Sequence, residues 1–240
     1  AEFMQQGWSL KQLHRLVVTS TVYRQSSVRT PDLDAVDREN RFYGAMSMRR
    51  LEAEALRDSI LAVSGMLNGQ AAGQPVPVMA DRDGQWVIGK ENLNAGRPGP
   101  VVPMLGQEFR RSLYIQVRRS RPLAVLSTFD LPRMDPNCTV RASSTVAPQA
   151  LMLMNSDFVT RQARYFAQRL QKEIPGDLPA QVGRAWKLAF AESAAPDEVT
   201  AAVQFLQQQA QQFEKQVASD NKKKKTDPAA EKKKHELAAL

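Results

Sequence analysis

The stretch DPNCTVRASSTVAPQAL, residues 135–151, carries the only cysteine of the 240-residue chain. A cysteine acts as a nucleophile when a helix N-terminus, a cation or an imidazole lowers its pKa. Arg141 lies three residues after Cys138, and the only imidazoles are those of His14 and His235. His14 follows leucines on a predicted helix, where a half-buried structural histidine is common. We expect Cys138 to be a buried thiol under a loop, because free cysteine is among the most buried residue types.

A pair of carboxylates, Glu54 and Asp58, stands four residues apart and therefore on one face of a predicted helix. Such pairs serve acid–base catalysis when the pKa of one carboxyl is raised. Arg50 precedes Glu54 by four residues and Arg57 follows it by three, so ion pairs along the helix explain the same spacing. We expect ordinary ion pairing here.

The segment RRSLYIQVRRSR, residues 110–121, contains five arginines. Its alternation predicts a strand with Leu113, Ile115 and Val117 toward the core and Tyr114, Gln116 and Arg118 on the other face. Guanidinium forks on that face suit carboxylate or sulfate groups. The alternative is that these arginines pair with acidic groups inside the fold. The candidate ligand-binding residues are Tyr114, Trp86, Arg118, Arg119 and Arg121, and the Trp86 ring is expected to be freely exposed.

The run SSTVAPQAL has the features of a helix start. Ser144 or Thr145 can accept backbone N–H bonds, and Pro148 suits the first turn because it lacks a donor that would go unpaired. A serine hydrolase needs a G-x-S-x-G elbow or its equivalent, which the sequence lacks.

Composition excludes several classes of protein. One cysteine excludes an intramolecular disulfide and a cysteine-based zinc site, and two histidines argue against a histidine metal centre. No apolar run approaches the roughly 18 residues of a membrane span. The net charge is +8, of which +4 comes from the lysine-rich run at 221–236, with seven lysines against three acidic residues. No nucleic-acid-binding motif accompanies this charge, so we expect no nucleic-acid partner.

The elements that position these residues are mostly helical. Apolar residues recur at helical spacing near residues 9–23, 48–67, 147–173, 178–190 and 196–217. Ser9 and Gln12 have the capping-box spacing at the start of the first helix, and the second should end near Gly65 or Gly69. Pro196, Asp197 and Glu198 suit the first turn of the last helix. Asp83-Gly84 lies between two apolar stretches and predicts a hairpin. We predict a mainly α fold with a small inserted β-hairpin and strand element at 69–119.

We expect one helical domain over 7–219. Residues 1–6 are typical of a cloning remnant and lead-in. Residues 220–240 are expected to form a lysine-rich, low-complexity segment followed by a truncated final helix.

Five blocks together resemble a known family: GWSLKQLHRLVVTSTVYRQSS, RRLEAEALRDSILAVSG, RRSLYIQVRRSRPLAVLSTFD, STVAPQALMLMNSDFV and RAWKLAFAESAAPDEV. In this order they resemble the planctomycete-specific domain of unknown function found toward the C-terminus of exported, cytochrome c-type multidomain proteins. The likeness covers most of residues 7–215 and identifies the chain as a fragment of such a protein. It implies an extracytoplasmic location, periplasmic or at the cell surface. Haem is expected only in a missing upstream domain, because the attachment motif C-x-x-C-H is absent from this chain.

Three functions fit these observations. The leading one is a non-catalytic interaction module that binds anionic polysaccharide, or the upstream domains of its parent protein, through the arginine strand and Trp86. The second is a polysaccharide hydrolase or lyase that uses Glu54, Asp58, Cys138 or His14. The third is a structural domain that packs against the upstream portion, which exposed apolar residues on the first helix would support.

Overall fold

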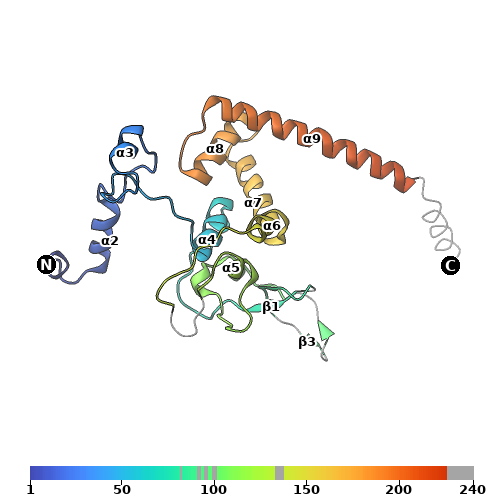
Figure 1. Cartoon of the computed structure of the whole chain (residues 1–240). Helices are drawn as coiled ribbons and strands as arrows, with labels where there is room; N and C mark the ends of the chain where they lie inside the picture. Colours follow the sequence, from blue (N-terminus) through green and yellow to red (C-terminus); the bar gives the residue numbers. More distant parts are fainter. Residues whose placement is uncertain (82, 91–92, 95–96, 99–101, 133–137, 226–240) are drawn as a thin grey trace. The chain divides into compact units, whose positions relative to one another are not determined.

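The computed structural model describes residues 1–225 apart from positions 82, 91–92, 95–96, 99–101 and 133–137 (Figure 1). Two compact units make up the chain, Ala1–Leu51 and Glu52–Leu240, and each is described by itself. Most of the predicted low-complexity segment at 220–240 lies outside the described residues.

The first unit contains three short helices: α1 (Glu2–Gln5), α2 (Leu10–Thr19) and α3 (Pro31–Val36). The expected start of α2 is confirmed, because Ser9 Oγ accepts a hydrogen bond from the Gln12 amide at 3.4 Å. After α3, the Asp37 carboxylate accepts the amides of Arg41 and Phe42, each at 2.8 Å. These bonds close the loop that leads out of α3, since a side chain can satisfy turn amides that lack backbone partners.

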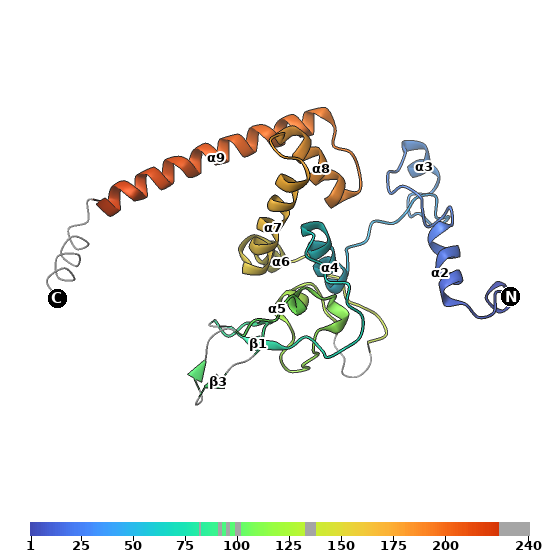
Figure 2. The same cartoon turned by 180° about the vertical axis from the view of Figure 1, so that it is seen from behind.

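The second unit is built from helices. They are α4 (Ala53–Ser64), α5 (Ala124–Thr128), α6 (Ala147–Asn155), α7 (Asp157–Glu173), α8 (Leu178–Phe190) and α9 (Pro196–Lys225), with two 3₁₀ turns, η1 (Gln107–Phe109) and η2 (Ser112–Tyr114). Helix α4 packs on α5 and α7, α6 packs on α5 and α7, and α8 packs on α7 and α9 (Figure 2). The mainly α prediction is confirmed.

A small β element is confirmed in the predicted region. Strands β1 (Val78–Ala80) and β2 (Trp86–Ile88) pair antiparallel, with Ala80 opposite Trp86. Gly84 adopts a φ of 78° in the turn between them, a conformation that favours glycine. A second antiparallel pair, β3 (Leu93–Asn94) with β4 (Arg97–Pro98), follows.

The predicted strand at residues 113–117 is wrong. Ser112–Tyr114 forms η2, and only Ile115 makes a bridge, with Val76. Ile115 is buried, but Leu113 and Val117 are 75% and 67% exposed. The physical reason lies in Asp58, whose Oδ1 accepts both the amide and the hydroxyl of Ser112 at 2.7 Å and so favours a turn over an extended ladder.

The hydrophobic core lies between α4, the hairpin and α5. Its buried members are Ala53, Val76, Val78, Ile115, Leu123, Leu126 and Phe129. Two arginines, Arg57 and Arg110, are each only 1% exposed beside this core. A buried charge is tolerated only where hydrogen bonds compensate its lost hydration. The two guanidiniums meet this need with backbone carbonyls, described below.

Several predicted helix ends can be compared with the structure. Helix α4 ends at Gly65, one of the two glycines predicted, with a φ of 80°. The Ser144 or Thr145 cap is wrong: α6 begins after Val146, and the Val146 amide donates to the Gln149 side chain at 3.2 Å. The Ser144 amide and hydroxyl instead bind the Asp130 carboxylate. Asp130, 14 residues before Ser144, therefore engages the predicted cap, and the start of α6 falls at Val146.

The predicted start of α9 is confirmed, with Pro196 as its first residue and Asp197 and Glu198 in its first turn. In the part of the chain that the structure describes, no helix combines the length and apolar character needed to cross a bilayer.

Candidate functional site

The candidate site is built around Trp86 of the hairpin. The Trp86 ring is half-buried and packs against the hydrophobic core from β2. This differs from the freely exposed Trp86 expected from the sequence. Burial of the ring fixes its position, because a packed aromatic side chain has few alternative rotamers.

Two arginines lie over the Trp86 ring. The guanidinium carbon of Arg121 lies 5.0 Å from the ring centroid, and that of Arg118 lies 5.4 Å away. Both distances fall within the range of cation–π attraction, which orients a guanidinium on an indole. We call Trp86, Arg118, Arg119 and Arg121 the guanidinium–indole cluster.

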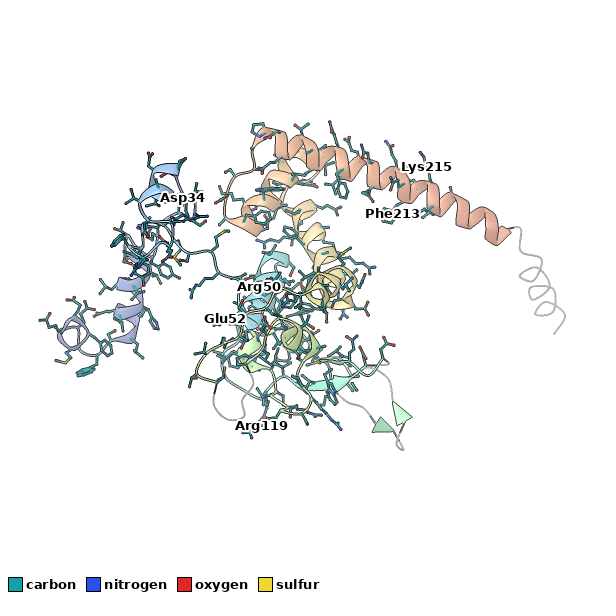
Figure 3. All side chains as sticks on the ribbon, viewed as in Figure 1. Asp34, Arg50, Glu52, Arg119, Phe213 and Lys215 are labelled. Carbon is teal, nitrogen blue, oxygen red and sulfur yellow. The ribbon has the colours of Figure 1, made fainter. Side chains whose placement is uncertain are left out.

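A tight turn holds the three arginines of this cluster together. The Arg121 amide donates to the Arg118 carbonyl at 3.0 Å, so the chain reverses between these residues. Buried Ile115 and Leu123 anchor the segment on either side of the turn. Arg119 is exposed in the turn and projects outward (Figure 3). Three positive charges are thereby concentrated within four residues.

These charges have no acidic partner in the described part of the chain. Every ion pair there belongs to other arginines, and no described side-chain hydrogen bond engages the guanidiniums of Arg118, Arg119 or Arg121. The guanidinium N–H groups of all three therefore lack an acceptor among the described residues. Such forks match the two oxygens of a carboxylate or sulfate.

Tyr114, also predicted for this site, has a different neighbour. Its ring lies under Arg110, whose guanidinium carbon is 4.2 Å from the ring centroid. Arg110 also donates to the carbonyls of Gln74, at 2.8 Å, and Ala72. Tyr114 thus supports a buried arginine that holds the loop before the hairpin.

Glu54, a candidate acid or base, is held in an ion pair. Its carboxylate accepts two hydrogen bonds from Arg141, at 2.7 and 3.2 Å, and Arg141 also lies 3.3 Å from Glu52. Burial raises the pKa of Glu54 most strongly, but the hydrogen bond from Arg141, a backbone hydrogen bond and the charge of Arg141 together outweigh it, so the pKa is lowered overall. Ion pairing is confirmed, but the expected pairing with Arg57 is wrong, because the Arg57 guanidinium lies in the core.

Asp58 is also engaged, but with other partners. Besides Ser112, its carboxylate lies 3.4 Å from Arg111 Nε and 3.6 Å from Arg57 Nη1. Asp58 and Glu54 therefore join α4 to two different distant segments. The pKa of Glu54 is lowered, whereas a general acid requires a raised one.

The expectation that Cys138 is buried is wrong. Cys138 is exposed, and its Sγ lies 3.1 Å from the carbonyl oxygen of Val140. The nearby Val140 is also exposed, by 83%. His14 is likewise exposed, on α2, and belongs to the first unit, whereas Cys138 belongs to the second. His235 lies outside the described residues.

One feature of α7 was missed from the sequence. An open depression with a volume of about 180 Å³ is lined by Asp157, Thr160, Arg161 and Arg164. The i, i+3 spacing of the two arginines was the available signal, since it places them on one helix face. Across the described residues, no three Cys, His, Asp or Glu side chains are grouped to hold a metal.

Comparison with known proteins gives one match. The family model PSD1, a protein of unknown function (DUF1553), matches residues 1–206 and thus includes the first six residues. No curated protein and no solved structure matches the chain.

Proposed function

Since this chain belongs to the PSD1 family (DUF1553), we propose that it is a non-catalytic module of an exported protein that binds an anionic glycan. The guanidinium–indole cluster carries this proposal: three arginines share one tight turn, two of them lie on one indole, and no described carboxylate neutralises them. Arginine forks recognise carboxylate and sulfate through paired N–H bonds. The ligand groups would therefore be the carboxylates or sulfates of a polysaccharide.

The position of the arginines also indicates how the glycan would bind. With two guanidiniums within 5.4 Å of the Trp86 centroid, a sugar ring could stack on the indole only by displacing them. The indole therefore serves to orient the guanidiniums. Binding should follow the negative charge of the ligand and weaken with added salt, because exposed ion pairs are screened.

The environments of the acid–base candidates favour binding over catalysis. A hydrolase or lyase, the alternative, needs a carboxyl with a raised pKa, whereas the pKa of Glu54 is lowered. We propose no cofactor for this chain and assign haem to another domain of the parent protein. It also places the parent protein outside the cytoplasm, among extracellular polysaccharides.

A direct test is titration with dextran sulfate, with neutral dextran as reference. We expect Arg118→Gln/Arg121→Gln to weaken binding at least about 10-fold, because each charge-assisted hydrogen bond is worth roughly 1.5–3 kcal/mol. The control Arg161→Gln/Arg164→Gln removes the same charge from two exposed arginines at the same spacing on α7. This control should change the affinity less than about 3-fold, because it removes only the general electrostatic attraction between the protein and the polymer. Equal losses in both variants would show that net charge alone attracts the polymer and would refute the site.

One observation favours the structural function as a second candidate. On one side of helix α2, Leu10, Leu16 and Val17 are exposed by 48–62%. An apolar helix face of this kind is typical of a surface that packs against another domain. The partner in this case is a neighbouring domain of the parent protein. Hydrogen exchange tests it: the α2 amides should exchange more slowly in the parent protein than in this chain, and equal rates would contradict the packing function.

A further inference from the structure

Helix α2 has an apolar face that the first unit leaves open. At about 100° per residue, four of its side chains fall within a sector of roughly 120°, namely Leu10, Leu13, Leu16 and Val17. We call these four residues the α2 face. Leu10, Leu16 and Val17 are 62%, 49% and 48% exposed. Figures 1 and 2 show α3 beyond the end of α2 rather than along its length, so α3 does not cover this face.

The first unit has almost no core of its own. The structure describes all of its residues, and only Asp37 and Ala45 among them are buried. A unit of this size with so little buried apolar surface is not stable by itself. Its apolar residues, those of the α2 face included, are therefore stabilised when another surface covers them.

The other side of α2 is basic. Lys11 and Arg15 lie about 40° apart there, and both are exposed. Arg24, which follows the helix, is exposed as well. None of these three residues forms an ion pair with an acidic residue in the described part of the chain. Residues 3–31 contain no Asp or Glu, so the sequence around α2 does not compensate this positive charge.

Exposed aromatic rings lie just outside both ends of α2. Trp8, two residues before the helix, is 65% exposed, and its ring contacts that of Phe3 with the centroids 5.3 Å apart. Tyr23, four residues after the helix, is 50% exposed. Indole and phenol rings are enriched at the boundary between lipid and water, because one part of the ring is apolar and the other forms hydrogen bonds.

We propose that α2 binds the surface of an anionic membrane, with the α2 face toward the acyl chains. A basic amphipathic helix with aromatic residues lies in such an interface with its apolar side buried about 5–10 Å deep. The helix is about 10 Å across, so Lys11 and Arg15 stay within a Debye length of the lipid phosphates. Their long side chains can also bend toward the headgroups. With 10 residues α2 is too short to cross a bilayer, so the binding is peripheral.

Charge distinguishes a lipid surface from the other partner for this face, a neighbouring domain of the parent protein. Either surface would cover the apolar side chains of α2. A protein surface carries charges of both signs, and packing against it gives no reason for the absence of acidic residues from 3–31. An anionic lipid surface is uniformly negative and complements the exposed cations of α2.

Sedimentation of the full chain with lipid vesicles tests the binding. We expect vesicles with about one third phosphatidylglycerol to bind the chain at least about 10-fold more tightly than vesicles of phosphatidylcholine alone, because each cation near an anionic surface contributes about fivefold. Added salt should weaken this binding, since it screens the charges. Binding to neither kind of vesicle would refute the proposal and leave the α2 face to a neighbouring domain. Equal binding to both kinds would refute it as well.

Two neighbouring valines provide a matched pair of variants. Val17 and Val18 are 48% and 46% exposed, but Val18 lies about 100° around the helix from Val17 and outside the α2 face. Val17→Gln should weaken binding to the anionic vesicles about 10-fold or more, because burial of a valine side chain contributes roughly that factor. Val18→Gln should change it less than about 3-fold, since this side chain stays in water. Equal affinities of the two variants would overturn the proposed orientation, and matched circular dichroism spectra would show that both variants fold.

Charge variants separate a specific site from general attraction. Lys11→Gln/Arg15→Gln should weaken binding to the anionic vesicles at least about 10-fold. Arg161→Gln/Arg164→Gln removes the same charge from exposed positions of the second unit and should change it less than about 3-fold. Equal losses would show that net charge alone attracts the chain and would refute the site. Val17→Gln leaves the guanidinium–indole cluster intact and should bind dextran sulfate like the unchanged chain, so this inference and the glycan proposal succeed or fail separately.

Discussion

Replacing Arg57 by methionine tests whether a buried guanidinium holds a distant loop on α4. Arg57 is 1% exposed and donates to the Glu108 carbonyl at 2.8 Å, the Arg110 carbonyl at 2.9 Å and Ser112 Oγ at 3.2 Å. It also lies over the ring of Phe158, 5.6 Å from the centroid. Methionine keeps much of the apolar stem and removes every donor.

The expected loss combines two opposing effects. Hydrogen bonds from a charged donor contribute roughly 1.5–3 kcal/mol each, so the three bonds of Arg57 contribute about 4–9 kcal/mol. Burial lowers the pKa of Arg57 from 12.5 to about 10, against the opposing charge of Asp58. At about 1.4 kcal/mol per pH unit, keeping the guanidinium charged costs roughly 3 kcal/mol, a cost that methionine avoids. We therefore expect Arg57→Met to lower the free energy of unfolding by about 2–5 kcal/mol.

Urea and thermal unfolding at pH 7, followed by circular dichroism, measure this loss. For a chain of this size it corresponds to a fall in Tm of about 5–15 °C. Arg164→Met is the control, because Arg164 is exposed on α7, and it should change stability by no more than about 0.5 kcal/mol. Arg57→Lys keeps the charge but not the planar fork, so it should lose most of the same stability.

An Arg57→Met variant that loses no stability would refute this reasoning. If Arg57→Met matches or exceeds the stability of the unchanged chain, the desolvation of the guanidinium outweighs its hydrogen bonds. The description of Arg57 as the residue that holds residues 108–112 on α4 would then be wrong. If Arg57→Lys is fully stable, the charge matters and the fork geometry does not.

Three further predictions concern other contacts. The pKa of Glu54 is lowered in the fold, so its contribution to stability is present above the ordinary pKa of 4.5 and is lost as the pH falls below that value. Glu54→Gln should therefore reduce the loss of stability at acid pH by up to about 1 kcal/mol. An unchanged dependence of stability on pH would contradict the pairing with Arg141. Gly65→Ala should cost about 1–2 kcal/mol in urea unfolding, because φ is 80° and the new Cβ would lie 3.2 Å from Arg169 Cδ; a neutral change would exclude strain at this cap. Exposed Cys138 should react with iodoacetamide in the folded chain about as fast as after denaturation, and protection until unfolding would show that the thiol is buried.

Local signals in the sequence were sufficient to predict most of the secondary structure. The cap at Ser9, the helix end at Gly65, the hairpin turn at Gly84 and the start of α9 at Pro196 all depend on residues within one turn of each other. Their hydrogen bonds and backbone angles are decided by neighbours in the chain, so a sequence pattern contains the necessary information. The mainly α class follows from the same signals.

Contacts between distant segments were not predictable in this way. Glu54 pairs with Arg141, 87 residues away, rather than with an arginine on its own helix. Asp58 turns the predicted strand into a 3₁₀ turn by binding Ser112, 54 residues away. In both cases the carboxylate binds a donor from a distant segment that folding brings close to it. The spacing of neighbouring residues in the sequence cannot predict such a contact.

The candidate site combines both kinds of information. The sequence by itself determined its chemistry, since the arginines at 118, 119 and 121 and the indole at 86 are evident from residue type alone. Only the tertiary structure decided that Arg118 and Arg121 lie on Trp86, while Tyr114 lies under Arg110. The reason is physical: burial of Ile115 and Leu123 anchors the turn beside β2, and these core contacts form between segments about thirty residues apart.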